Sequence, residues 1–250
     1  VPGQIESELN AQVYDWIVNC AAYTAVDQAE SEPAAAKAVN DTAVAALSVC
    51  AQRRGARLLH LSTDFVFDGR SRTPYAPDSA VNPLSVYGKT KRAGESHVAA
   101  RGANVLLRTS WVYAAGGHNF VRTMLRLMGE RDEVKVVADQ MGSPTWATGL
   151  ADAIWALIDV EPCGGIYHWS DEGIVSWHGF AVEIQRMALA RGLLTREIPV
   201  RPIATGEYPA KALRPAFSAL DTHDTQRIIG RRAVAWRRNL EVMLDELRAS

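Results

Sequence analysis

Short hydrophobic runs alternate with longer stretches of helical spacing through the first half of the chain. Buried strands are predicted at 13–19, 57–61 and 104–108, and helices at 31–54 and 85–100. Strands that alternate with helices in this way predict a parallel sheet covered by helices on both faces. We therefore expect an α/β fold built around such a sheet.

The pattern loosens beyond Trp111, where prolines interrupt it repeatedly. Helices are predicted near 118–131, 146–159, 176–191 and 236–248, and short strands near 134–138, 165–169 and 198–203. We assign residues 1–110 to the domain that forms the sheet. Residues 111–250 are assigned mostly to a smaller lobe, with some segments returning to the sheet.

Composition narrows the class of protein. Of the 250 residues, 48% are hydrophobic and 22% are charged, which is enough apolar material to bury a core. The formal net charge of -1 argues against a nucleic acid or a membrane surface as partner, because both favour a basic excess. We expect a globular protein that binds neither.

Cysteine and histidine are too scattered for a disulfide framework or a zinc site. Cys20, Cys50 and Cys163 show no CxxC spacing, and no HxxxH or HExxH motif is present. No apolar run approaches the roughly 20 residues that span a bilayer, and the first residues do not resemble a signal peptide. We expect a cytoplasmic protein with no metal site built from its side chains.

Ligands of parallel sheets bind beyond the carboxyl ends of the strands. The predicted strands end near Val18, Leu61 and Arg108, so the turns that follow them lie at one edge of the sheet. Small and hydroxylated residues in these turns, among them Ser62 and Thr63, are therefore candidates for a binding site.

The strongest chemical signal is the segment YGKTKRAGE, which begins at Tyr87 on a predicted helix. Tyr87 and Lys91 are four residues apart and share one helical face, with Cβ atoms roughly 6 Å apart. A phenol has an ordinary pKa near 10, and lowering it by about 3 units takes roughly 4 kcal/mol. One exposed ammonium contact supplies about 1 kcal/mol, so we expect a bound cationic cofactor ring or partial burial to help form the phenolate.

The segment LSTDFVFDG strengthens this interpretation, because it places Ser62 and Thr63 directly after a strand. Thr63 precedes Tyr87 by 24 residues. A hydroxyl and a phenol can bind a carbonyl oxygen together, and the phenol can supply a proton as hydride arrives. A Thr–Tyr–Lys set therefore suits ketone reduction. Taken alone, the two hydroxyls are equally well explained as caps of the strand end.

Several motifs follow one another along the chain in the same order as in one known family. These motifs are NCAAYTAVDQAESEP, LSTDFVFDG, YGKTKRAGE, RTSWVY, NFVRTMLRL, DQMGSPT and RP–S–LDT. Together they resemble the dTDP-4-dehydrorhamnose reductases of the extended short-chain dehydrogenase/reductase superfamily. The resemblance covers the chain from about Asp15 to the C-terminus. It implies a Rossmann-like sheet and NADPH- or NADH-dependent reduction of a 4-keto sugar to dTDP-L-rhamnose.

The resemblance also implies roles for single residues. Tyr87 would donate the proton, Lys91 would bind the nicotinamide ribose and tune Tyr87, and Thr63 would bind the C4 oxygen. The cofactor would be lined by Ala22, Tyr23 and Thr24. The sugar or the nucleotide would be bordered by Val26, Asp64, Phe65 and Trp111, and Arg214 would meet the diphosphate. Trp111 also fits a core aromatic, and Arg214 also fits a structural ion pair.

The implied partner is a nucleotide sugar, and a homodimer is compatible with the resemblance. Members of the family use magnesium in some cases, but no carboxylate cluster in the sequence identifies a magnesium site.

One departure concerns the phosphate cradle. A dinucleotide-binding fold opens with a strand, a Gly-rich turn and a helix, yet no GxGxxG or GxxGxxG occurs in the sequence. Residues 1–110 are therefore expected to be a partial dinucleotide-binding domain that lacks the first βα unit or units. Residues 111–250 would be mostly the substrate-binding lobe.

Two alternatives stay open. The first is a sugar-nucleotide dehydratase or epimerase of the same superfamily. Dehydratases place an acidic residue directly after the Thr-Asp pair, where this chain has Phe65, so the sequence favours simple reduction. The second is a non-catalytic protein that resembles the regulatory beta subunit of methionine adenosyltransferase. The absence of a Gly-rich turn favours it, whereas the intact Thr63, Tyr87 and Lys91 argue against it.

Overall fold

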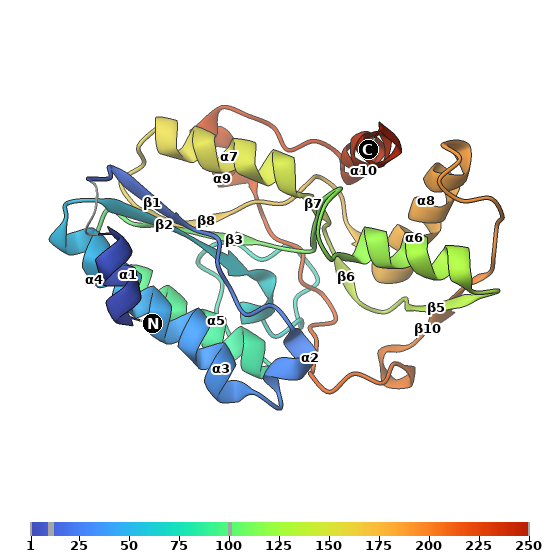
Figure 1. The fold of residues 1–250 in the computed structure, drawn as a ribbon, viewed down its shortest axis with the longest axis horizontal. Helices are drawn as coiled ribbons and strands as arrows, with labels where there is room; N and C mark the ends of the chain where they lie inside the picture. Colours follow the sequence, from blue (N-terminus) through green and yellow to red (C-terminus); the bar gives the residue numbers. More distant parts are fainter. Residues whose placement is uncertain (1, 10–12, 100–101, 250) are drawn as a thin grey trace.

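Four parallel strands form the central sheet, in the order β1-β2-β3-β8 (Figure 1). The computed structural model describes residues 2–9, 13–99 and 102–249. The strands are β1 (Trp16–Asn19), β2 (Arg57–Thr63), β3 (Val105–Thr109) and β8 (Gly165–His168). Every residue of β3 is buried, because helices cover both faces of the sheet.

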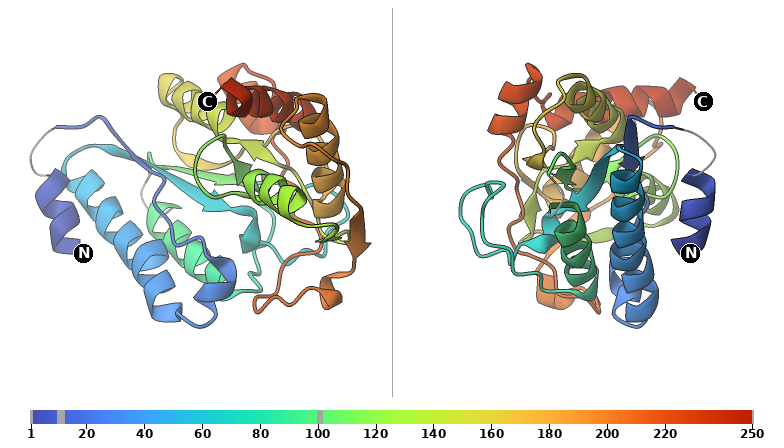
Figure 2. Two further views of the ribbon diagram at one scale, coloured as in Figure 1. Left: turned by 45° about the vertical axis from the view of Figure 1, so that its right-hand side comes forward. Right: turned by 90° about the vertical axis from the view of Figure 1, so that its left-hand side faces the viewer.

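One face of the sheet is covered by helices that precede and follow β2. They are α3 (Pro33–Lys37), the π-helical turn η1 (Ala38–Thr42), α4 (Ala43–Arg53) and α5 (Val86–Ala99). Val44 and Ala51 of α4 and Val98 of α5 pack against Leu58 and Leu106 of the sheet. Helix α1 (Pro2–Leu9) contacts α4 on the same side (Figure 2).

The opposite face is covered by α7 (Ala147–Asp159) and α9 (His223–Ile229) (Figures 1 and 2). Leu150 and Leu157 of α7 pack with Leu59 and Leu107 in one hydrophobic cluster. The sheet is thus the middle of three layers, as the alternating pattern predicts.

A second cluster lies beside the sheet, where α6 (Phe120–Glu130), α8 (Trp177–Ala190) and α10 (Trp236–Ala249) pack together. The parallel pair β5 (Val134–Val137) and β10 (Val200–Ile203) belongs to this lobe. Two further pairs join β4 (Val112–Tyr113) to β7 (Thr145–Trp146) and β6 (Met141–Gly142) to β9 (Val175–Ser176). β8 comes from the second half of the chain and pairs with β3 in the central sheet. The domain boundary near residue 110 stays a prediction.

Some predicted boundaries are wrong. The first strand begins at Trp16 instead of Val13, whose side chain is 92% exposed and has no apolar surface to pack on. The helix expected over 31–54 begins at Pro33 and is interrupted by η1. Helix α5 matches the prediction over 85–100 within a residue, and Ala100 lies outside the described residues. Elements that were not predicted are α1, α2 (Val26–Ala29), α9, the short strands β4, β6, β7 and β9, and the short helices η2 (Asp64–Val66) and η3 (Thr205–Glu207).

Helix α5 approaches η1 closely enough that only glycine fits at one position. A Cβ atom on Gly94 would lie 2.1 Å from the carbonyl oxygen of Asn40. We expect Gly94→Ala to destabilise the fold by about 1–3 kcal/mol, because the helix must move away from η1. Gly129→Ala in α6 is the matched control, since its Cβ would meet nothing within 4 Å. Urea unfolding of both variants measures the difference, and equal midpoints would contradict the close approach.

Candidate active site

The carboxyl ends of β1, β2 and β3 lie together at one edge of the sheet. In the parallel register Asn19 at the end of β1 pairs with His60, and Thr63 at the end of β2 pairs with Thr109 at the end of β3. Helix α5 contacts β2, β3 and the short helix η2 (Asp64–Val66) that follows β2. This edge therefore brings α5 beside Thr63.

Tyr87 and Lys91 occupy successive turns of α5 and are 8% and 2% exposed. The helix start is fixed by Ser85, whose Oγ accepts the backbone N–H of Gly88 at 3.1 Å. A Cβ atom on Gly88 would lie 2.3 Å from the carbonyl oxygen of Phe65. Glycine at this position lets α5 approach η2, which places Tyr87 against the end of β2.

Burial raises the pKa of the Tyr87 phenol to about 12, since it removes the water that stabilises the anion. A side-chain hydrogen bond with Thr63 acts in the opposite direction, and the charge of Asp64 adds to the rise. Our expectation that burial helps to form the phenolate is therefore wrong. At neutral pH Tyr87 keeps its proton, as a proton donor must.

The Thr63 hydroxyl both caps η2 and contacts the phenol. Its Oγ1 accepts the backbone N–H of Phe65 at 3.2 Å and donates to Oδ1 of Asp64 at 3.1 Å. The capping explanation for Thr63 is therefore confirmed, while its contact with a substrate carbonyl stays a prediction. Ser62 instead donates to Oε1 of Glu95 at 2.7 Å in the interior.

Asp64 is a buried carboxyl group next to these residues, with 2% of its surface exposed. Burial raises its pKa to about 6, although hydrogen bonds from Ser218 and Thr63 oppose the rise. Its Oδ2 atom is buried and has no hydrogen-bond partner within the described ranges. A contact of Asp64 with a ligand stays a prediction.

The Lys91 side chain runs along α5 toward the end of β2. Its Nζ donates to the carbonyl oxygen of Leu61 at 2.6 Å and lies 3.4 Å from Nε2 of His60. Burial lowers the pKa of Lys91 to about 8, while the nearby Glu95 and Cys20 raise it. Lys91 can therefore gain or lose a proton close to neutral pH.

The turn over Ala22, Tyr23 and Thr24 follows β1 and is held by Asn40 from η1. Asn40 Oδ1 accepts the backbone N–H of Tyr23 at 2.8 Å, and its Nδ2 donates to the Tyr23 carbonyl at 3.1 Å. Nδ2 also lies 3.2 Å from Oγ1 of Thr90 on α5. Asn40 was not among the predicted site residues. The one available signal was a polar residue in an Ala-rich stretch. The hydrophobic pattern does not reveal the π-helical turn that orients the Asn40 side chain toward Tyr23.

An apolar cluster joins the residues predicted for the cofactor side to those predicted for the substrate side. Tyr23, Val26 and Phe65 pack around the buried Tyr87. The Phe65 and Tyr87 rings meet edge to face, with centroids 5.5 Å apart. The structure thus brings these predicted residues together at one place.

A cavity of 410 Å³ extends from Phe65 between the sheet edge and the lobe. Aromatic rings and cationic side chains share its lining, which comprises Phe65, Phe120, Trp177, Tyr208, Arg131, Lys135 and Arg214 together with Thr123, Met124, Leu127, Val136, Val137 and Gln140. Rings suit a base or a sugar, and cations suit phosphate groups. Among the lobe residues of this lining, Arg214 is the one to which the sequence assigned a role in the site.

Arg214 forms the ion pair that the sequence allowed, and its contact with a diphosphate stays a prediction. Its guanidinium forms an ion pair with Asp27, with 2.5 Å between Nη2 and Oδ2, and it lines the cavity. The same carboxylate accepts the backbone N–H groups of Lys211 and Ala212. Asp27 therefore fixes both the guanidinium and the loop that carries it.

Trp111 is placed one residue layer behind the cavity. Its backbone has φ of 47°, which is unusual outside glycine, and its ring stacks on Trp177 with centroids 3.5 Å apart. Trp177 lines the cavity, whereas Trp111 is not among its lining residues. A direct contact of Trp111 with a ligand stays a prediction.

A buried ion pair behind the site was also missed by sequence analysis. Arg108 donates from Nε and Nη2 to the two carboxylate oxygens of Glu95 at 2.8 and 2.9 Å. Ser62 shares this carboxylate, so β2, β3 and α5 are joined directly behind Thr63 and Lys91. In the sequence, Glu95 follows Lys91 by four residues, which is typical of an exposed ion pair on a helix surface. Only the packing of α5 shows that Glu95 is buried.

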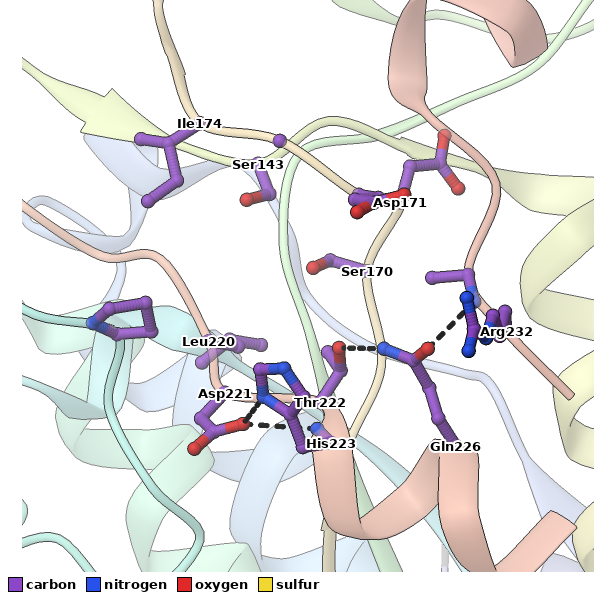
Figure 3. Close-up of a pocket in the computed structure, with 14 residues that line it drawn as sticks. Ser143, Ser170, Asp171, Ile174, Leu220, Asp221, Thr222, His223, Gln226 and Arg232 are labelled. Carbon is purple, nitrogen blue, oxygen red and sulfur yellow. Dashed lines mark hydrogen bonds and ion pairs between the residues drawn. The ribbon is translucent and has the colours of Figure 1, made fainter. Parts of the chain in front are cut away.

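A second cavity, of 480 Å³, lies between the segment after β8 and helix α9 (Figure 3). Asp171, Asp221, His223 and Gln226 are among its lining residues. Thr63, Tyr87 and Lys91 do not line it. The predicted chemistry therefore belongs to the sheet edge and not to this cavity.

The described side chains give no indication of a metal or membrane site. Among them, no group of three or more His, Cys, Asp and Glu residues could hold a metal ion. In the same ranges no helix is both long and apolar enough to cross a bilayer.

A parallel sheet with Thr63 at its carboxyl edge and a buried Tyr–Lys pair on the adjoining helix defines the class of short-chain dehydrogenases/reductases. Residues 2–249 match the family described as RmlD substrate binding domain. The chain belongs to this family.

Relatives agree with this assignment. A dTDP-4-dehydrorhamnose reductase of Burkholderia thailandensis is 44% identical over 236 residues, which cover 89% of this chain and 78% of the relative. A solved dTDP-4-dehydrorhamnose reductase of Clostridium acetobutylicum is similar at a TM-score of 0.91 with 36% identity, covering 98% of this chain and 85% of that one. The same values apply to the reductase of Bacillus anthracis solved in complex with NADP.

Proposed function

We propose that this protein uses NADPH or NADH to reduce the 4-keto group of a dTDP-6-deoxy-hexulose, giving dTDP-L-rhamnose. The observation that carries the proposal is the Tyr87 phenol, which is buried and keeps its proton at neutral pH, with Thr63 beside it and Lys91 one turn further on. Relatives with 36–44% identity carry the corresponding reductase name.

The residues present fit the ribose and nicotinamide half of such a cofactor. Lys91 Nζ and the Tyr87 hydroxyl are hydrogen-bond donors from successive turns of α5, as two ribose hydroxyls would require. The backbone of Ala22, Tyr23 and Thr24 follows β1 at the same edge and is held by Asn40. When bound there, the cofactor supplies hydride to the sugar carbonyl.

The chain's own groups handle the oxygen of that carbonyl. Tyr87 would donate a hydrogen bond to it, and Thr63 would donate a second one by turning its hydroxyl away from Asp64. The phenol would transfer its proton as negative charge develops on the oxygen. Phe65, packed on Tyr87, would exclude water from the proton path. Asp64 is buried beside these residues, and we expect it to border the sugar.

The nucleotide diphosphate would occupy the cavity of 410 Å³ beside Phe65. Its aromatic rings would hold the base and its three cations the phosphates. Trp177 lies between this cavity and Trp111, so Trp111 would act by supporting the stacked ring.

Among the alternatives, a dehydratase lacks support at the residue that follows Asp64. Elimination of a sugar hydroxyl needs an acid there, and Phe65 offers an apolar ring packed on Tyr87. A non-catalytic regulatory role is disfavoured because Thr63, Tyr87 and Lys91 are not merely retained but also brought together and buried.

Oxidation of NADPH and of NADH, followed at 340 nm with a panel of dTDP-, UDP- and GDP-linked 4-keto-6-deoxy sugars, tests the proposal. We expect turnover with the dTDP-linked substrate, and NMR of the product should show the rhamno configuration. Incubation of dTDP-glucose with NAD⁺ tests for dehydration. Elimination in that assay, or no turnover with any 4-keto sugar, would overturn the proposal.

We also place the protein in the cytoplasm, where nucleotide sugars are made. Its three cysteines, Cys20, Cys50 and Cys163, are all free thiols, as a reducing compartment requires. A homodimer stays a prediction that sedimentation of the purified chain would test.

We expect Arg214→Met to raise KM for the nucleotide sugar about 10-fold and to leave kcat within a few-fold. The reason is that a phosphate contact of this kind contributes equally to ground-state and transition-state binding, at roughly 1.4 kcal/mol. Asp27→Asn is the matched control, because it breaks the ion pair and keeps the cation in the cavity. The same rise in KM for both variants would reduce Arg214 to a structural partner of Asp27.

A further inference from the structure

Behind Lys91 lies a buried chain of side chains that the reductase mechanism does not use. It consists of Asn19 at the end of β1 and His60 within β2, which are 7% and 0% exposed. His60 lies between Asn19 and Lys91. Its Nδ1 is 2.9 Å from Asn19 Nδ2, and its Nε2 is 3.4 Å from Lys91 Nζ.

The orientation of the Asn19 amide is set by the backbone of the turn after β1. Asn19 Oδ1 accepts the N–H of Ala21 at 3.1 Å. The amide nitrogen must therefore face His60, and because an amide NH₂ only donates, Nδ1 of His60 is the acceptor. Turning the amide round would place two donors, Ala21 N–H and Asn19 NH₂, against each other.

The tautomer of His60 follows from this orientation. The imidazole is neutral, since burial and the neighbouring Lys91 charge lower its pKa to about 3, although a hydrogen bond with the backbone of Asn19 opposes the fall. A neutral ring that accepts at Nδ1 carries its proton on Nε2. This N–H points at Nζ of Lys91.

A donor that faces Lys91 affects its two protonation states differently. An ammonium group has no lone pair, so an N–H directed at it is repelled, whereas the neutral amine can accept that hydrogen bond. The other groups that face Lys91 are the carboxylate of Glu95 on α5, the carbonyl of Leu61 on β2 and the thiol of Cys20 after β1. Glu95 and Leu61 favour the ammonium, and His60 opposes them.

We propose that His60, oriented by Asn19, is a positioning residue that presents its Nε2–H to Lys91 and disfavours the charged form of the lysine. The inference rests on the proposed function, in which Lys91 serves Tyr87. Because His60 opposes the groups that favour the ammonium, Lys91 exchanges a proton near neutral pH and is not a permanent cation. Acid–base groups work best when their pKa lies near the working pH.

The decisive experiment is NMR on the full chain without substrate. Long-range ¹⁵N–¹H correlation reports the tautomer of His60, and lysine labelled with ¹³C at Cε reports the titration of Lys91, assigned with Lys91→Arg. We expect the Nε2–H tautomer in the wild type. An Nδ1–H tautomer would overturn the proposal directly, whatever the variants show.

Two variants test the coupling. Asn19→Asp is nearly isosteric and keeps an acceptor for Ala21, but its carboxylate demands a proton on Nδ1, which turns a lone pair toward Lys91. His60→Leu removes the N–H without adding charge. Both should raise the titration midpoint of Lys91 by about 1 pH unit.

His168→Leu is the matched control, because His168 is also 0% exposed and contacts Arg108, not Lys91. It should lower stability and leave the Lys91 titration in place. If both test variants also leave it in place, the proposal fails.

The alkaline limb of the kcat profile should follow the same shifts. Because NMR needs no turnover, an inactive enzyme with the expected titrations would sink the reductase proposal alone.

Discussion

Tyr87→Phe should lower kcat by about 10²–10⁴-fold while the Kd for NADPH changes no more than a few-fold. Phenylalanine keeps the ring that packs on Phe65 and removes the proton that the phenol donates. The loss is one of transition-state stabilisation, and general acid catalysis contributes in this range. Steady-state kinetics and fluorescence titration of the cofactor measure the two quantities.

Thr63→Val is a useful companion to this variant, since it removes the hydroxyl that bonds Tyr87 at nearly constant volume. It should retain more activity than Tyr87→Phe, because the phenol can still donate. Wild-type turnover by purified, folded Tyr87→Phe would show that another group supplies the proton.

Lys91→Met should impair two steps, with kcat reduced about 100-fold and the KM for NADPH raised. Methionine fills a similar volume at this buried position but offers no donor to a ribose hydroxyl and no charge to influence Tyr87. The pKa of Lys91 is lowered to about 8, so its ammonium is present below that pH and lost above it. The wild-type rate should therefore fall above about pH 8, and this limb should be absent in the variant.

Lys89→Met controls for the loss of a lysine from the same helix, because Lys89 is exposed and two residues away. It should leave both constants and the pH profile unchanged. An alkaline limb that survives in Lys91→Met would assign that limb to a different group and make Lys91 a structural residue.

The sequence by itself determined the local features of this protein. The pairing of Tyr87 with Lys91 follows from a separation of four residues on one helix, and the three-layer fold follows from the alternation of strands and helices. Thr63 could be placed near Tyr87 because the carboxyl ends of parallel strands share an edge. Each of these inferences needs only short-range geometry and one general rule of sheet topology.

Only the tertiary structure decided the environment of those residues. The raised pKa of Tyr87 depends on burial, the aim of Asn40 depends on a π turn packed against α5, and the cavity beside Phe65 is built by α6, β5 and α8. The donor that faces Lys91 is fixed by Asn19 and His60, which are 41 residues apart in sequence. Burial and hydrogen-bond direction arise from contacts between distant segments, so no local pattern of residues could specify them.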